Sequence, residues 1–174
     1  MVNMKFNIRD SKNREGPGDN IFSKDNVDID GQIKLKINDK CAEIFTDELD
    51  YGTYEIEAIL PIIMNKNIVF SPFLYEDDTH ELDIEFSRWG SIFTPNCQFV
   101  IQPNNVRRFF SFKRNVKCKI DWQKDYVQFE VNGTKWLHKG QMPTKARFHI
   151  NLWKLKDTKV PETEIIIKSF KFTK

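Results

Sequence analysis

The sequence has 174 residues and carries 27 Lys and Arg against 25 Asp and Glu, so its formal net charge is +2. This length suits one domain that buries most of its apolar surface. The near-neutral charge argues against a nucleic-acid-binding protein, which would show a clear basic excess. No run of 18 or more apolar residues occurs, so no transmembrane helix is expected.

The N-terminal part of the chain shows no periodic pattern. Residues 1–15 are polar and are expected to form a flexible segment, and residues 15–20 (EGPGDN) predict a loop. Residues 1–11 contain no apolar core of a signal peptide. The cellular location therefore remains open between a mature exported form and an intracellular protein.

From residue 33 onward, apolar and polar residues alternate in short stretches, which predicts strands. We expect strands at residues 33–37, 42–46, 54–60, 69–75, 81–87, 97–102, 107–113, 116–122, 126–131, 134–138, 148–153 and 164–172. Asn132-Gly133 is typical of a two-residue hairpin turn. Residues 107–113 (RRFFSFK) are interpreted as an edge strand whose basic side chains discourage pairing, rather than as a site for an acidic sugar. No helix of note is predicted, so we expect a single all-β domain over residues 1–174, a sandwich or a barrel.

The three cysteines, Cys41, Cys97 and Cys118, do not have the spacing of metal ligands. Cys118 shares its parity with Val116 and Ile120 and is interpreted as a small core residue. The odd count excludes a complete disulfide framework but leaves room for one bridge. No Asp/Asn-rich loop indicates calcium either, so neither a metal nor a cofactor is predicted.

The most informative stretch is residues 80–89 (HELDIEFSRW). Three acidic residues alternate with three apolar ones, which in a strand places them on opposite faces: Glu81, Asp83 and Glu85 against Leu82, Ile84 and Phe86. Three like charges in a row repel and raise the pKa of at least one carboxyl, which is an arrangement that acid–base chemistry uses. The alternative is the solvated outer face of an antiparallel sheet.

An aromatic segment at residues 70–75 (FSPFLY) precedes this acidic strand, and residues 76–79 predict a turn between them. The resulting hairpin would place Phe73 and Tyr75 beside the carboxylates. Aromatic rings stack on sugars, and paired carboxylates hydrolyse glycosidic bonds. The pattern therefore indicates a carbohydrate, either a polysaccharide or an oligosaccharide, as the partner.

Residues 81–86 (ELDIEF) resemble the E-x-D-x-E signature of glycoside hydrolase family 16. Further segments resemble that family in the same order: AEI at 42–44, YGTYE at 51–55, FLY at 73–75, DW through VNG at 121–133, and MP through NLW at 142–153. The resemblance covers roughly residues 16–172. It implies a concanavalin A-like jelly roll, a β-sandwich of two curved antiparallel sheets, and cleavage of β-1,3- and β-1,4-linked glucans or galactans.

The resemblance also implies roles for individual residues. Glu81 would be the nucleophile of a retaining double displacement, Glu85 the acid/base, and Asp83 the residue that tunes both pKa values. Cleft positions are implied for Phe73, Tyr75, Gln98, Asn151 and Trp153, with Gln98 bonded to sugar or to Glu85.

Two further residues are cleft candidates. His149 shares the face of Asn151 and is interpreted as a polar residue of the cleft wall rather than a catalytic one. Trp89 would supply a relocated aromatic platform. For Phe73, Tyr75, Trp89 and Trp153, simple packing remains the alternative.

The chain departs from the family in ways that concern its activity. Thr79 stands two residues before the implied nucleophile, where the glucanases carry tryptophan, and Glu57 occupies a position that is usually basic. The first interpretation is an endo-β-glycosidase or a transglycosylase. A non-catalytic, lectin-like carbohydrate-binding domain and a structural protein remain alternatives to it. A monomer is expected, and the family implies an exported protein.

Overall fold

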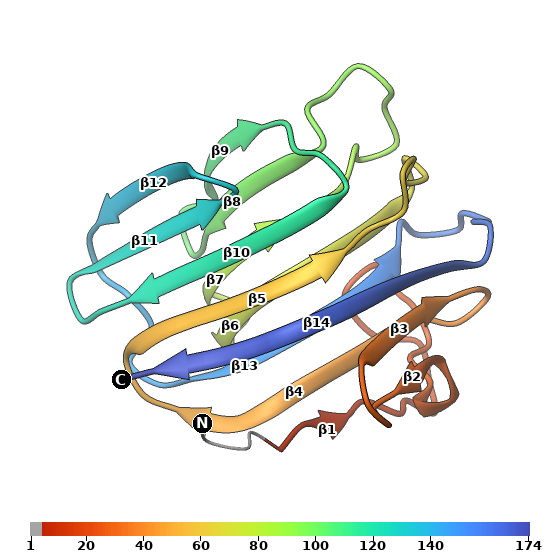
Figure 1. Ribbon diagram of the computed structural model, residues 1–174, viewed down its shortest axis with the longest axis horizontal. Helices are drawn as coiled ribbons and strands as arrows, with labels where there is room; N and C mark the ends of the chain where they lie inside the picture. The colour runs from red at the N-terminus through yellow and green to blue at the C-terminus, as the bar shows by residue number, and fades with distance from the viewer. Residues whose placement is uncertain (1–4) are drawn as a thin grey trace.

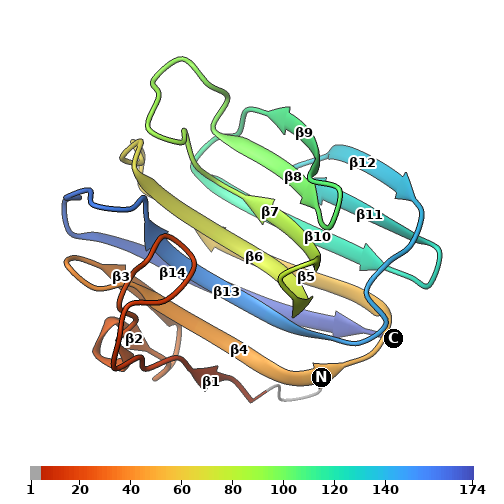
Figure 2. The same cartoon turned by 180° about the vertical axis from the view of Figure 1, so that it is seen from behind.

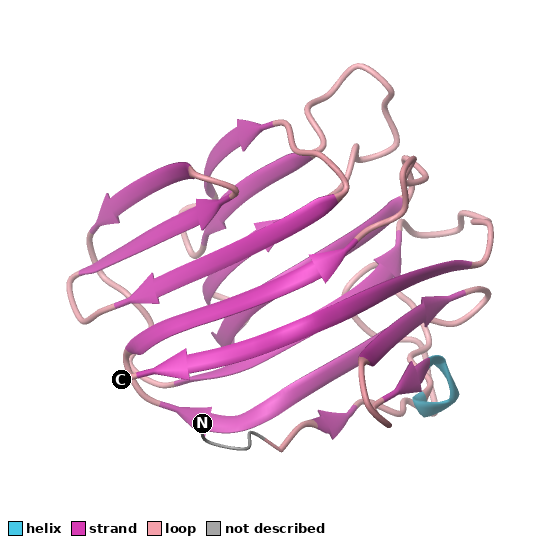
Figure 3. Ribbon diagram, in the orientation of Figure 1, coloured by secondary structure: helices cyan, strands magenta, loops and turns pink. Residues whose placement is uncertain are grey.

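The computed structural model describes residues 5–174, in which two seven-stranded antiparallel sheets pack face to face (Figures 1 and 2). The first sheet has the strand order β1-β4-β13-β6-β7-β8-β9, and the second has the order β12-β11-β10-β5-β14-β3-β2. Almost all regular structure is strand (Figure 3), and the single helical turn in the described residues is the 3-10 turn η1. The predicted β-sandwich is confirmed.

The strands of the first sheet are β1 (Asn7–Ile8), β4 (Ala42–Leu49), β6 (Ile68–Asp77), β7 (His80–Glu85), β8 (Cys97–Ile101), β9 (Val106–Phe110) and β13 (Ala146–Lys154). Those of the second sheet are β2 (Val27–Asp28), β3 (Ile33–Ile37), β5 (Gly52–Ile59), β10 (Asn115–Trp122), β11 (Tyr126–Val131), β12 (Thr134–Lys139) and β14 (Thr163–Thr173), and η1 spans Lys24–Asn26. The positions of the twelve predicted strands are confirmed, including the edge position of β9, which ends three residues earlier than expected.

The core lies between the sheets and is rich in aromatic side chains, because each strand turns its apolar parity inward. Tyr54 of β5 stacks on Phe148 of β13 at 5.4 Å between ring centroids, and Phe99 of β8 stacks on Phe129 of β11 at 5.1 Å. Trp122 is fully buried and donates its indole N–H to the carbonyl of Pro143 at 3.1 Å. The contacts between the sheets use the inner face of each one. The outer face of the first sheet takes no part in this core and can carry a site.

Two local predictions are also confirmed. Asn132 and Gly133 have φ angles of 49° and 87°, the pair of positive values that a two-residue type I′ hairpin requires. All three cysteines are free and buried, and Cys118 packs in the core. No helix within residues 5–174 has the length and apolar character needed to cross a bilayer.

The N-terminal region differs from the expectation. The segment expected to be flexible lies partly in residues 1–4, which are outside the described residues. From Asn7 onward the chain pairs with the first sheet, since Asn7 lies opposite Phe45 and the backbone N–H of Arg9 donates to the carbonyl of Glu43 at 3.0 Å. Two-residue strands such as β1 and β2 are too short to produce a periodic signal in sequence.

Candidate active site

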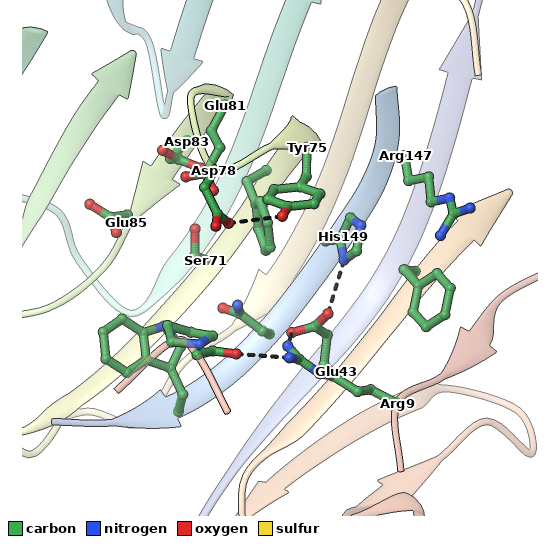
Figure 4. Close-up of a pocket in the computed structure, with 16 residues that line it drawn as sticks. Arg9, Glu43, Ser71, Tyr75, Asp78, Glu81, Asp83, Glu85, Arg147 and His149 are labelled. Atoms are coloured by element: carbon green, nitrogen blue, oxygen red, sulfur yellow. Dashed lines mark hydrogen bonds and ion pairs between the residues drawn. The ribbon is translucent and has the colours of Figure 1, made fainter. Parts of the chain in front are cut away.

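A cleft of about 550 Å³ lies on the outer face of the first sheet (Figure 4). Strands β4, β13, β6 and β7 form its floor, and the loop at Gly16-Pro17 borders it. Within residues 5–174, no group of three or more His, Cys, Asp or Glu side chains is arranged to hold a metal ion.

Strand register assembles the cleft from residues that are distant in sequence. Tyr75 of β6 lies opposite Glu81 of β7, and Phe73 lies opposite Asp83. On the other side of β6, His149 of β13 pairs with Phe73 and Asn151 pairs with Ser71. Residues that pair across neighbouring strands point to the same side of a sheet, so acidic, aromatic and polar side chains form rows across the cleft.

The three acidic residues of β7 all line the cleft and are named in Figure 4. Burial raises the pKa of Glu81 to about 7, with added repulsion from Glu85, Asp78 and Asp77. Burial and the two flanking glutamates hold the pKa of Asp83 well above its ordinary value, and only 5% of this residue is exposed. Burial also raises the pKa of Glu85. Burial and mutual repulsion thus favour the protonated forms of these carboxyl groups, unlike those on the fully solvated outer face of a sheet.

Gln98 lies opposite Glu85 on β8 and donates its side-chain N–H to the Glu85 carboxylate. This hydrogen bond and the charge of Arg107 oppose the rise in the pKa of Glu85. Gln98 is buried and does not line the cleft. The expected bond from Gln98 to Glu85 is present, and Oε1 of Gln98 has no partner within the described residues.

The aromatic candidates present less ring face to the cleft than the sequence suggested. Phe73 and Tyr75 both line it, but Phe73 stacks on His149 at 4.9 Å, and Phe45 stacks on the imidazole at 5.3 Å. Rings stacked side by side along a sheet expose their edges. Tyr75 donates its hydroxyl to Asp78 at 2.9 Å, and burial raises its pKa to about 12.

Trp153 lines the cleft with 8% of its surface exposed. Gly18 approaches its indole so closely that a Cβ there would lie 2.8 Å from Cε3. Trp89 packs edge-on against Trp153 at 5.9 Å and is not among the cleft-lining residues. The packing alternative therefore describes Trp89, whose φ of 51° turns the chain at the end of the acidic strand.

A buried ionic network in the cleft was not predicted. Glu43 of β4 is 3% exposed and accepts a hydrogen bond from Arg9 Nη1 at 2.9 Å. Its second oxygen lies 2.9 Å from Nδ1 of His149. An ionised carboxylate only accepts hydrogen bonds, so this contact assigns a proton to Nδ1 of His149 and leaves Nε2 as the second hydrogen-bonding atom of the ring. Nε2 of His149 is buried and has no hydrogen-bond partner within the described residues, and the same holds for Oδ1 of Asn151. His149 and Asn151 both line the cleft, so a hydroxylated ligand there is a candidate partner for these two atoms.

Sequence comparison found no matching family model and no matching curated protein. Comparison of structures gave clear matches. A β-glucanase of Bacillus licheniformis superposes with a TM-score of 0.78 at 22% identity, covering 97% of this chain and 92% of that one. The chain has the glucanase fold.

Two other solved structures match to a similar extent. A β-1,3-1,4-glucanase (lichenase) derived from a mouse hindgut metagenome gives a TM-score of 0.74 at 22% identity, covering 95% of this chain and 92% of that one. An immunostimulatory antigen and pseudo β-1,3-glucanase of Mycobacterium tuberculosis gives 0.72 at 13% identity, covering 95% and 89%. The resemblance to the glycoside hydrolases found in the sequence is thus confirmed for the fold, on a scaffold that carries both enzymes and a pseudo-enzyme.

Proposed function

We propose that this protein is a retaining endo-β-glycosidase that acts on a polysaccharide such as a β-glucan or a galactan. The observation that carries the proposal is the row of three carboxyl groups on β7, which faces an open cleft with raised pKa values. Packing of the sandwich does not need these groups, because the other parity of β7 supplies the core. Perturbed acids in a cleft are a frequent mark of catalysis.

The proposed reaction has two displacements. Glu81 attacks the anomeric carbon and forms the glycosyl–enzyme bond, while the carboxylic acid of Glu85 gives its proton to the departing glycosidic oxygen. Glu85 then removes a proton from water, and the water oxygen displaces Glu81 from the anomeric carbon with overall retention. Asp83 lies between the two and couples their titration, so that the cluster holds a proton at neutral pH.

The assignment of Glu81 and Glu85 to these roles follows the order of the family signature. The electrostatic surroundings favour the opposite assignment. Gln98 and Arg107 favour the charged form of Glu85, and Asp78 disfavours the charged form of Glu81. Azide rescue of the alanine variants separates the two assignments. Azide adds from the opposite face in place of a missing nucleophile, so Glu81→Ala should yield the inverted glycosyl azide and Glu85→Ala the retained one. The reverse pattern would exchange the roles.

We propose that Asn151 and His149 bind substrate hydroxyls through their unpartnered buried atoms, and that Phe73, Tyr75 and Trp153 contribute apolar contacts. Trp89 and Gln98 would act through Trp153 and Glu85, respectively, rather than on the sugar.

The second candidate function is a non-catalytic carbohydrate-binding domain. The pseudo β-1,3-glucanase of Mycobacterium tuberculosis, which shares the fold, favours it, as does Thr79 at a position where tryptophan is expected. Thr79 instead caps the β6–β7 turn by donating its hydroxyl to Asp77 at 2.7 Å.

The deciding experiment is reducing-sugar release from a panel of β-glucans, xyloglucan, agarose and carrageenan, with Glu81→Gln as the test variant and Glu162→Gln as a matched control on an exposed loop. Release by the wild type and the control, and none by Glu81→Gln, would support the enzyme. No release from any polymer, with retarded migration in a gel that contains one of them, would refute the enzyme and favour the binding domain.

A further inference from the structure

One end of the sandwich exposes four large apolar side chains on two neighbouring loops. Ile62 and Ile63, between β5 and β6, are 79% and 87% exposed, and Ile92 and Phe93, between β7 and β8, are 63% and 90% exposed. The other exposed large apolar residues, Ile29, Phe109 and Leu137, are about half exposed and lie on other elements. Single exposed apolar residues are ordinary, whereas a group of four at one end of a molecule marks an interaction site.

The two loops form one surface. The backbone N–H of Gly90 donates to the carbonyl of Lys66 at 2.9 Å, and Arg88 Nη1 donates to the carbonyl of Ile92 at 2.9 Å. Arg88 also lines a shallow pocket of about 130 Å³ with Ile62 and Ile63. In both views of the ribbon the two loops extend from the same end of the sandwich (Figures 1 and 2). We call residues 61–67, 88–96 and 111–115 the loop-tip surface, since the β9–β10 segment 111–115 supplies the rest of the pocket.

The loop-tip surface is basic in a chain that is nearly neutral. It contains Lys66, Arg88, Lys113 and Arg114 and no Asp or Glu, although the chain carries 25 acidic residues. None of the four cations forms an ion pair within residues 5–174. Exposed apolar side chains next to unpaired cations are suited to bind a partner that has an apolar interior and an anionic surface.

We propose that the loop-tip surface docks the protein on an anionic lipid bilayer. Ile62, Ile63, Ile92 and Phe93 enter the interfacial region, and the four cations lie against the lipid headgroups. A polysaccharide does not fit this surface as well, because three of the four tips are isoleucines, whose branched side chains offer no flat face to a sugar ring. A protein partner fits it less well too, because Lys113 lines the pocket with Ile62 and Ile63, and lysine is depleted at the cores of protein interfaces. No residue of the loop-tip surface lines the cleft, so the proposal is independent of the proposed activity.

The test is co-sedimentation of the full chain with vesicles of phosphatidylcholine, with and without about 30% phosphatidylserine. We expect binding to the anionic vesicles that weakens as salt is added. The double variant Ile63→Ser/Phe93→Ser should lower this binding by at least about tenfold, because it removes two of the most exposed apolar tips. The matched control is Ile29→Ser/Leu137→Ser, which removes two exposed apolar side chains elsewhere and should bind as the wild type does.

A second measurement reports insertion directly. In Phe93→Trp, the added indole should shift its emission to shorter wavelength on mixing with anionic vesicles. Absence of vesicle binding, or binding that Ile63→Ser/Phe93→Ser leaves unchanged, would overturn the proposal. So would a concentration-dependent dimer that this double variant abolishes without any vesicle binding, because the surface would then join two copies of the chain.

Discussion

The acidic row on β7 should make the protein less stable at neutral pH than at mildly acidic pH. The folded protein holds the proton of Glu81 up to about pH 7, whereas the unfolded chain releases it near 4.5. The raised pKa therefore stabilises the fold at low pH, and this contribution is lost as the pH rises through about 7. Undiscounted, the shift amounts to ~3.4 kcal/mol. Glu81 is partly exposed, so we expect roughly 1–2 kcal/mol after solvent screening.

The variant Glu81→Gln removes this titration and nearly preserves the shape of the side chain. Urea unfolding followed by tryptophan fluorescence should show the variant about as stable as the wild type at acidic pH. At slightly alkaline pH the variant should be more stable by roughly 1–2 kcal/mol. Glu162→Gln, on an exposed loop, should follow the wild type at both values. A difference between wild type and Glu81→Gln that stays constant with pH would refute the reasoning.

Three further predictions concern the cleft and the turns. Gln98→Leu removes the hydrogen-bond donor to Glu85 and should raise the pKa of Glu85. The alkaline limb of the pH profile of kcat/KM, measured on a polymer that the protein cleaves, should therefore move to higher pH. An unmoved limb would contradict this. Glu43→Gln removes the charge that Arg9 faces in the cleft, while Arg9 keeps Glu15 and the carbonyl of Gly16 as partners. The variant should lower the free energy of unfolding in urea by roughly 1–2 kcal/mol, against a small effect of the exposed control Glu48→Gln. Gly133→Ala should lower the free energy of unfolding by ~1 kcal/mol through backbone strain alone, because Gly133 has a φ of 87° and nothing lies within 4 Å of the added Cβ. An unchanged melting temperature would exclude that strain.

The fold could be predicted from the sequence to the extent that each strand has one buried face. Alternation with period two marks such strands, and it fails where pairing is short, as at Asn7–Ile8 and Val27–Asp28. The alternation also stops being informative where the chain leaves the sheet. Trp89 follows the acidic strand, but its positive φ turns it against Trp153, and no parity argument extends past that turn.

Some residues of the candidate site could likewise be predicted from local sequence, and others could not. The positions of Glu81, Asp83 and Glu85 on one face follow from local alternation. The link between Glu43 and His149 does not, because these residues lie 106 positions apart and meet only through the pairing of their strands. Arg9 completes that link from a segment with no periodic signal. Local sequence thus identified the acids, whereas the register of β4 against β13 determined the polar network opposite them.

The stacked arrangement of Phe45, His149 and Phe73 has a consequence for selectivity. A floor of ring faces would grip many sugars alike, because every pyranose has an apolar side. Here the rings show their edges, and the unpartnered atoms beside them belong to His149 and Asn151. Directional hydrogen bonds penalise a misplaced hydroxyl far more than flat contacts do. On the proposed function, we expect this cleft to distinguish sugar chains that differ only in the configuration of one carbon.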